Sequence, residues 1–279
     1  MKVEANLKAF RLGRQAVADP EAFADLLEGR ADAPKPERGL SAEARRTLEL
    51  VEAAPGSELA RLLAVRVPDL IAYQNVAYAT RYARFVEQVR QAEGESVPGS
   101  TALTEAVARH LHKLMAYKDE YEVARLSLDP EVERGVKARF GGGARISYRL
   151  HPPVLRALGM TRKIELGPWF KPAFQALAAM RRLRGTRLDP FGAARVRRTE
   201  RALVVEYQAT ITEVCRNLDE DCHGLAVEIA SLPDTVRGYE KIKMTSVARY
   251  RTRSAELVGR LSSGRERTEA DTAASRDEL

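Results

Sequence analysis

The sequence predicts a mainly α-helical protein, a multi-helix bundle-like domain with at most a short β-strand or hairpin near residues 145–150. Apolar residues recur every three or four positions through most of the chain, which is typical of amphipathic helices. Strand patterns are scarce, and 279 residues are enough to bury a sizeable core. The positions of proline and glycine predict an N-terminal helical segment (1–33), a linker (34–40) and a helical domain (41–261). The polar, charged composition of residues 262–279 predicts a disordered tail.

The cysteine content and the beginning of the chain indicate a compartment. Only Cys215 and Cys222 are present, which is typical of a reducing environment in which thiols stay unpaired. Met1 is followed by charged, amphipathic sequence, and no apolar run is long enough to cross a bilayer. The sequence therefore predicts a soluble, cytoplasmic protein without a membrane partner.

The N-terminal part is predicted to contain two helices joined by the linker. The first is expected over about residues 3–27, and the prolines and glycine of 34–40 keep the following segment out of a helix. Ser41 is the candidate N-cap of the second helix, because a serine oxygen accepts from the free amides of a first helical turn. A Pro-Gly pair at 55–56 is expected to end it.

The segment 57–93 carries an apolar stripe that predicts one long helix or two. Pro68 lies within it, and we expect a kink or break there, because proline lacks the amide hydrogen and clashes with the preceding turn. A loop over 94–100 and a helix over about 101–127 are expected to follow. The positions expected to face the core are Leu59, Leu62, Leu63, Leu70, Ile71, Val76, Tyr82, Phe85, Val86, Val89, Leu103, Val107, Leu111, Leu114, Met115 and Tyr121.

The best strand candidate in the chain is 145–150, where apolar and charged residues alternate with period two. Three glycines at 141–143 precede it. We interpret them as a flexible turn and not as a phosphate cradle, because a strand follows them where a phosphate loop would need a helix N-terminus. Two prolines at 152–153 end the strand.

The C-terminal half is predicted to be helical again. A helix over about 167–183 has Pro172 suited to its first turn, and a second covers about 193–218. Acidic residues at 219–221 favour the N-terminus of a third helix, which ends at a proline, and the last helix covers about 236–261.

Cys215, Cys222 and His223 invite a metal-site interpretation, which the spacing does not favour. The interval matches no zinc pattern, and nothing nearby supplies a second pair of ligands. His110 and His112 are two positions apart on a predicted helix, so they point to different faces and cannot chelate one ion. Nucleophile elbows and dinucleotide fingerprints are missing as well. The sequence therefore assigns no catalytic, cofactor-binding or metal-ligating residue.

The densest polar cluster lies at 117–125, within the helix predicted over 101–127. Its charged side chains are spaced three or four positions apart, which places them on one flank of a helix beside two tyrosines. The members are Tyr117, Lys118, Asp119, Glu120, Tyr121, Glu122 and Arg125. Two interpretations stay open: a solvated helix face, with each pair contributing roughly a few tenths of a kcal/mol, or a recognition or domain-docking surface.

The formal net charge of +7 is concentrated in residues 162–201. The basic residues there are Arg162, Lys163, Lys171, Arg181, Arg182, Arg184, Arg187, Arg195, Arg197, Arg198 and Arg201, against Glu165, Asp189 and Glu200. Aromatic residues such as Trp169 are interleaved with them, as in surfaces that bind nucleic acid or another polyanion. The acidic residues among them favour instead a solvated surface or an intramolecular contact.

Seven unusual strings follow one another along the chain: 72–75 (AYQN), 114–126 (LMAYKDEYEVARL), 150–153 (LHPP), 166–169 (LGPW), 183–192 (LRGTRLDPFG), 200–207 (ERALVVEY) and 232–243 (LPDTVRGYEKIK). In this order they resemble the uncharacterised helical domain that closes fused bacterial indolepyruvate ferredoxin oxidoreductases. Residues 3–14 (VEANLKAFRLGR) are similar to the end of the gamma-type oxidoreductase domain that precedes it in those chains. The resemblance covers about residues 3–260.

The resemblance implies part of an enzyme that converts aryl 2-oxoacids and coenzyme A to acyl-coenzyme A and reduces ferredoxin, using thiamine diphosphate, magnesium and iron–sulfur clusters. This chain has no Gly-Asp-Gly segment for the diphosphate and its magnesium, and two cysteines cannot supply the four thiolates of one cluster. We therefore expect a non-catalytic part or subunit whose cofactors lie in the rest of the enzyme. Its expected partners are the remaining domains or chains, and ferredoxin.

Three groups of residues are candidates for this docking: the polar cluster, the basic stretch and the last of the strings. The candidates are Lys118, Asp119, Glu120, Glu122, Arg125, Trp169, Arg181, Arg182, Arg184, Arg237 and Lys243. The alternative function is that of a stand-alone helical binding protein that uses residues 162–201 on nucleic acid or another polyanion.

Overall fold

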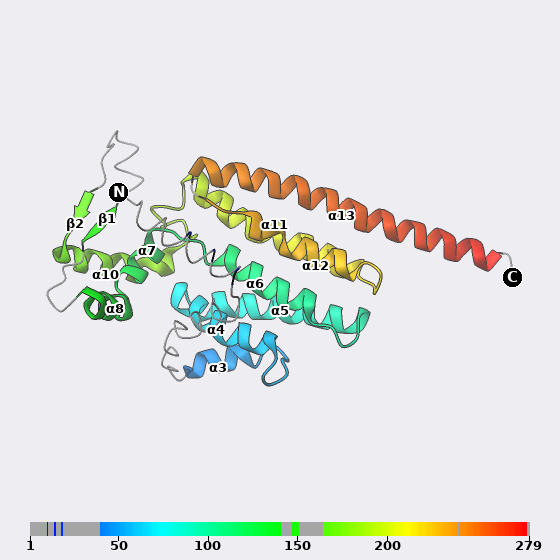
Figure 1. The fold of residues 1–279 in the computed structure, drawn as a ribbon, viewed down its shortest axis with the longest axis horizontal. Coiled ribbons are helices and arrows are strands. Elements are labelled where there is room, and N and C mark those ends of the chain that lie inside the picture. Colours follow the sequence, from blue (N-terminus) through cyan, green and yellow to red (C-terminus); the bar gives the residue numbers. More distant parts are fainter. Residues whose placement is uncertain are drawn as a thin grey trace. The chain divides into compact units, whose positions relative to one another are not determined.

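The computed structural model describes residues 40–140, 147–150, 164–238 and 240–277, together with Phe10, Arg14 and Ala18 (Figure 1). The chain divides into two compact units, Met1–Ser41 and Ala42–Leu279. In the first unit, Phe10, Arg14 and Ala18 are helical and exposed. The rest of the helix predicted over 3–27, and residues 34–39 of the predicted linker, lie outside the described residues.

The second unit consists mainly of helices, which confirms the predicted fold class. The α-helices of this unit are α3 (Ala42–Leu48), α4 (Glu58–Tyr73), α5 (Val76–Ser96), α6 (Ala102–Met115), α7 (Glu120–Ser127), α8 (Pro130–Phe140), α10 (Lys171–Ala179), α11 (Arg195–Arg216), α12 (His223–Ser231) and α13 (Glu240–Asp277). Short 3₁₀ turns are η1 (Pro168–Phe170), η2 (Met180–Leu183) and η3 (Leu232–Thr235). None of the described helices is long and apolar enough to cross a membrane.

Helix α6 lies at the centre of the core. It packs against α4, α5, α11 and α12, and α13 packs on α11 and α12 (Figure 1). The apolar stripes predicted for α4, α5 and α6 face this core, with Ile71 and Val76 only partly buried at its margin. Burial of such side chains contributes about 1.5–3 kcal/mol each, so the stripes account for the packing of these helices.

Two buried tyrosines link neighbouring helices of this core through hydrogen bonds. Tyr82 of α5 donates from its hydroxyl to the carbonyl oxygen of Ala108 at 2.8 Å, and Tyr207 of α11 donates to that of Ala230 at 2.8 Å. Both tyrosines are fully buried. Their rings therefore fill apolar space while their hydroxyls stay hydrogen-bonded, as burial of a polar group requires.

The segment 57–93 forms two helices, one of the two predicted alternatives, but they are divided at Gln74 and Asn75 and not at Pro68. Helix α4 continues through Pro68 to Tyr73. The side chain of Asn75 accepts from the amide of Tyr78 at 2.9 Å and so caps the N-terminus of α5. Asparagine is more favourable as an N-cap than inside a helix, which explains the position of the break.

The helix predicted over 101–127 is also two helices, so this prediction was wrong. Helix α6 ends at Met115, and α7 begins at Glu120 after the N-cap residue Asp119. No proline or glycine lies between them. The contacts that fix this break come from residues more than 60 positions away and are described below.

Two short strands lie between α8 and α10 in the chain. Strand β1 (Tyr148–Leu150) pairs with β2 (Ile164–Leu166) in antiparallel register, with Arg149 opposite Glu165. This confirms a short hairpin near 145–150, whereas residues 141–146, with the glycine turn, lie outside the described residues. Pro172 lies in the first turn of α10, as predicted.

The C-terminal helices differ from the prediction mainly in their ends. The chain leaves the helix after Arg216 and re-enters at His223, so Cys215 and Cys222 are not on one continuous helix, as expected. Helix α13 continues to Asp277, beyond the predicted end at 261 and through most of the segment predicted as a disordered tail. Residues 262–277 contain no proline, which would end a helix, and Gly264 weakens the helix there without ending it.

Candidate functional site

The polar cluster predicted at 117–125 is buried at its centre. Asp119 is 3 % exposed, Glu122 7 % and Tyr121 1 %. A solvated helix face, the first of the two interpretations of this cluster, is therefore wrong. The side chains of Asp119 and Glu122 serve contacts inside the molecule instead, because a charge is buried in a protein only when it is paired or hydrogen-bonded.

Asp119 holds two parts of the chain together. One carboxylate oxygen, Oδ1, accepts from the amide of Glu122 at 2.9 Å, which caps α7. The same carboxylate receives Arg184 in a bidentate pair, with Nε–Oδ2 at 2.5 Å and Nη2–Oδ1 at 2.8 Å. Planar guanidinium and carboxylate groups match in this geometry, which makes the pair directional as well as strong.

Arg184 lies in the interior and is 4 % exposed. Its Nη1 donates to the carbonyl oxygen of Tyr73, the last residue of α4, at 2.5 Å. The guanidinium carbon lies 3.5 Å from the centre of the Tyr73 ring and 5.5 Å from that of Tyr121, so two aromatic faces cover the cation. Burial lowers the pKa of Arg184, but the hydrogen bond to Asp119 and the electrostatic interactions with Tyr73, Asp119 and Tyr117 together raise that pKa above its ordinary value.

Tyr121 and Asp189 complete this arrangement. The Tyr121 hydroxyl donates to Oδ1 of Asp189 at 2.9 Å, and its ring meets Phe191 edge to face, with centroids 5.3 Å apart. The Tyr73 hydroxyl donates to the carbonyl oxygen of Tyr117 at 2.9 Å, within the break between α6 and α7. We call the set Tyr73, Asp119, Tyr121, Arg184 and Asp189 the arginine clasp; it joins the end of α4, the start of α7 and the segment 183–192.

A second chain of charges runs beside the clasp. Arg197 of α11 pairs with Glu120 at 3.2 Å and with Glu200 at 2.7 Å, and Lys243 of α13 also pairs with Glu200. Burial alone lowers the pKa of Arg197, but Glu200 and Glu120 raise it above its ordinary value. Helices α7, α11 and α13 are thus linked through alternating charges.

Glu122 and Arg125 form a third set of ion pairs beside the clasp and the second chain of charges. Their spacing of three positions on one helix predicted this pair. The two side chains meet in a bidentate pair at 2.6 and 2.8 Å, and Arg125 also contacts Asp69 of α4 at 3.0 Å. Asp69 in turn contacts the ring of His112 at 3.1 Å. Although burial raises the pKa of Asp69, its hydrogen bonds with His112 and its attraction to Arg125 bring that pKa below the ordinary value.

The remaining candidate residues are not brought into the clasp. Lys118 and Arg182 are exposed, and Trp169 is 71 % exposed with its ring against Phe170. Arg181 is partly buried and donates to the carbonyl oxygen of Ala178, while Arg237 pairs at the surface with Asp234. The predicted group therefore splits: Asp119, Glu120, Glu122, Arg125, Arg184 and Lys243 join the internal networks, and the other five do not.

The residues present do not fit the cofactors that the resemblance implies. Burial raises the pKa of the Cys215 thiol to about 11, which favours the thiol over the thiolate that binds metal. The Cys222 thiol donates to the carbonyl oxygen of Asn217 at 3.2 Å. Within the described part of the chain, no group of three or more His, Cys, Asp or Glu side chains is placed to hold a metal ion.

A cleft beside the second chain of charges is small. Its volume is about 170 Å³, and Tyr117, Lys118, Glu200 and Lys243 contribute to its walls. Pockets that enclose a cofactor or a drug-sized ligand usually measure about 300–1,000 Å³. This cleft is smaller than such pockets, and the polar side chains of the clasp are paired with one another.

Sequence reasoning missed Tyr73, Asp189, Arg197 and Glu200 as members of these networks. Signals for them existed, since Tyr73 lies in the string at 72–75 and Asp189 in the string at 183–192. Arg197 and Glu200 are one helical turn apart; Arg197 was noted only as part of the basic stretch, whereas Glu200 also lies in the string at 200–207.

The comparisons with known proteins concern the region that contains these networks. The chain matches a Family of unknown function (DUF6537) over residues 59–256, which is more than half of its length and includes every clasp residue. No curated protein and no solved structure matches the chain. This protein therefore belongs to the DUF6537 family.

Proposed function

We propose that this chain is a non-catalytic C-terminal part or subunit of a 2-oxoacid ferredoxin oxidoreductase, of the kind that acts on indolepyruvate. In this proposal the thiamine and iron–sulfur core of the enzyme converts an aryl 2-oxoacid and coenzyme A to acyl-coenzyme A and reduced ferredoxin. The chain docks on that core and supplies no catalytic group. The proposal rests on the seven ordered strings that resemble the closing domain of the fused enzymes.

The observation that carries the proposal is where these strings lie in the folded chain. The strings at 72–75, 114–126 and 183–192 supply all five residues of the clasp. Those at 200–207 and 232–243 supply Glu200 and Lys243 to the adjacent chain of charges. The resemblance is thus concentrated in the polar contacts that fix the relative positions of the helices, which is what a shared fold would retain.

The alternative function on nucleic acid receives less support. Affinity for a polyanion depends on the number of basic side chains that reach its phosphates. Arg184 and Arg197 of the basic stretch are engaged in internal ion pairs, and Arg201 donates to the carbonyl oxygen of Gly192 at 2.7 Å. These three arginines are not available to a polyanion at the surface.

Affinity purification tests the proposal. The chain, tagged at one terminus, is expressed at its natural level in cells shown to make a thiamine-dependent 2-oxoacid oxidoreductase. We expect the thiamine-binding chain to be recovered with it, together with thiamine diphosphate and iron. Absence of that chain after mild cross-linking would refute the proposal, and salt-sensitive recovery of DNA or RNA would favour the alternative.

A further inference from the structure

Residues 183–192 form a loop whose conformation is fixed by its own side chains; we call it the braced loop. Asp189 accepts from the amide of Gly185 at 2.8 Å and from that of Phe191 at 3.1 Å. Thr186 donates to the carbonyl oxygen of Leu183 at 2.7 Å. Gly185 has a φ of 76°, which a side chain would strain. The loop is therefore held in one shape and anchored below by Arg184.

The braced loop displays a large apolar side chain to solvent. Leu188 is 75 % exposed, the largest value among the exposed large apolar side chains of the described residues. A single exposed leucine is ordinary on a protein surface. The backbone that carries Leu188 is hydrogen-bonded within the loop on both sides, so binding would remove less conformational freedom from it than from a loop without such bonds.

Exposed arginines whose side chains have no partner among the described residues lie close to this leucine in the sequence. Arg182, Arg187, Arg195 and Arg198 are exposed, and their side chains have no partner among the described residues. Arg198 is one helical turn from Arg201, which donates to the loop carbonyl of Gly192, so the first turns of α11 adjoin the braced loop. We call Arg182, Arg187, Leu188, Arg195 and Arg198 the arginine–leucine surface.

The acidic residues of this stretch do not balance these charges. Between positions 182 and 201 they are Asp189 and Glu200. Asp189 is occupied by the braced loop and Tyr121, and Glu200 by Arg197 and Lys243. The fold therefore uses its carboxylates internally and leaves four cations at the surface.

We propose that the arginine–leucine surface is a docking site for an acidic protein surface that offers an apolar socket to Leu188. Four unmatched arginines favour a negative partner by charge complementarity. Arginine is enriched in protein interfaces, and the buried centre of an interface is more apolar than its rim. A leucine, unlike an aromatic residue, cannot stack on a base, so the surface favours protein over nucleic acid. This inference deepens the proposed function and rests on it for the identity of the partner.

Site-specific photocross-linking of the full chain tests this inference in the cells that encode it. The photoreactive residue is introduced as Leu188→p-benzoylphenylalanine and, as a control, as Ile242→p-benzoylphenylalanine, because Ile242 is comparably exposed on α13 at 71 %. We expect a protein adduct at position 188, with the cross-linked partner peptide rich in aspartate and glutamate. The pair R182E and R198E should reduce this adduct by about tenfold, since like charges then oppose each other.

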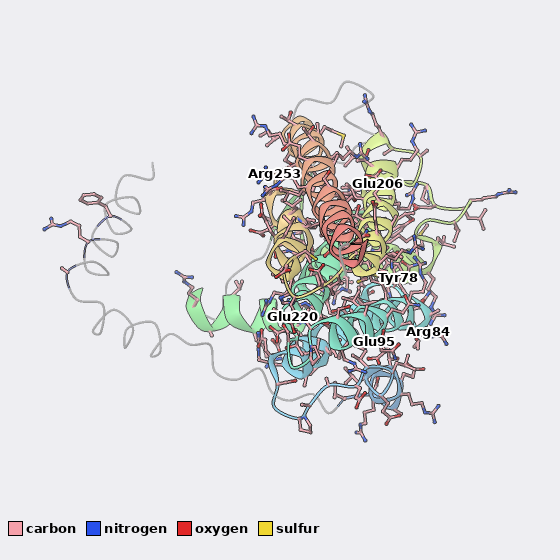
Figure 2. The ribbon with its side chains drawn as sticks, turned by 90° about the vertical axis from the view of Figure 1, so that its right-hand side faces the viewer. Tyr78, Arg84, Glu95, Glu206, Glu220 and Arg253 are labelled. Carbon is pink, nitrogen blue, oxygen red and sulfur yellow. The ribbon has the colours of Figure 1, made fainter. Side chains whose placement is uncertain are left out.

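Matched controls separate docking from folding. R84E on α5 reverses the charge of an exposed arginine that has no partner among the described residues and is far from the loop in sequence. Figure 2 shows Arg84 at the outer side of its helix. This variant should leave the adduct unchanged. Because all three arginines are exposed, the variants should retain the thermal unfolding midpoint of the parent chain. In a lysate of the same cells, raising the salt concentration should also reduce the adduct of the chain that carries no charge reversal.

Each outcome decides one of the two proposals. An adduct to the thiamine-binding chain that the charge reversals abolish supports both. An adduct to an acidic peptide of another protein, abolished in the same way, supports the docking surface but assigns it to a partner other than the thiamine-binding chain; recovery of that chain by affinity purification then decides the proposed function separately. A yield at 188 no higher than at 242, a yield insensitive to R182E and R198E, or an adduct to nucleic acid overturns the docking surface.

Discussion

Removing the cation of the arginine clasp should strongly destabilise the protein. R184M keeps the aliphatic stem but leaves the carboxylate of Asp119, 3 % exposed, with only the amide of Glu122 as donor. It also leaves the carbonyl oxygen of Tyr73 without its 2.5 Å hydrogen bond from this side chain. Removing one partner of a buried ion pair typically costs about 3–5 kcal/mol. We expect a loss of that size in the free energy of unfolding, measured by urea denaturation.

A double-mutant cycle separates the pair from the packing around it. D119N retains a good N-cap for α7 while removing the negative charge. The double variant R184M with D119N no longer contains an uncompensated buried charge. It should therefore lose less stability than the sum of the two single variants, by about 2 kcal/mol, within the range usual for contacting residues.

Arg237 offers a matched control, because it also forms an arginine–aspartate pair. Its contact with Asp234 measures 2.6 Å, but the side chains are 73 % and 55 % exposed. R237M should therefore cost less than about 1 kcal/mol. If R184M cost no more than R237M, or if the cycle were additive, burial would not govern the energy of the clasp and the reasoning would be refuted.

Three further predictions concern the core. Burial raises the pKa of Glu93, but hydrogen bonds from Thr104, His223 and backbone amides bring that pKa below its ordinary value of 4.5. The ionised carboxylate therefore contributes its full stabilisation above pH 4.5. This stabilisation is lost as the pH falls through the pKa of Glu93 in the folded state. E93Q should reduce stability at neutral pH and flatten the loss of the thermal midpoint between about pH 5 and about pH 3. Y207F leaves the buried carbonyl oxygen of Ala230 without its donor and should cost about 1–3 kcal/mol in urea unfolding, and a cost near zero would mean that water replaces the hydroxyl. L257A removes a fully buried side chain of α13 and should cost about 2–5 kcal/mol, against less than about 0.5 kcal/mol for I242A at an exposed position of the same helix.

Much of the fold could be predicted because its signal is local. Leu103, Val107 and Leu111 are spaced by one helical turn, and the structure buries all three. The same periodicity places Tyr207 and Ile211 of α11 in the core. Helix class and core faces depend on neighbours in sequence, so one chain is enough to predict them.

The break between α6 and α7 depends on distant residues and could not be predicted. Residues 116–119 contain no helix breaker, and Asp119 is equally compatible with a helix interior facing solvent. What makes it an N-cap is Arg184, 65 positions away, which holds its carboxylate in place. A single helix through this segment would present the carboxylate to another side of the molecule.

Only the part of the candidate site that depends on contacts between sequence neighbours could be predicted. The pair Glu122–Arg125 lies within α7, so helical spacing was sufficient to predict it. Lys118 lies before the helix, and the expected spacing to Glu122 therefore does not apply. Arg181, Arg182 and Arg184 look alike in the sequence, and only the turn at η2 directs Arg184 into the interior and leaves Arg182 outside.

The distances along the chain that the clasp closes have a kinetic consequence. Arg184 meets Asp119 across 65 positions and Tyr73 across 111. Closing such long loops costs entropy before the contact returns any energy, so we expect the clasp to form late, after the core helices have packed. A contact that forms after the rate-limiting step of folding lowers the unfolding rate and leaves the folding rate nearly unchanged. The clasp is thus expected to slow unfolding, and its removal should raise the unfolding rate while leaving the folding rate nearly unchanged.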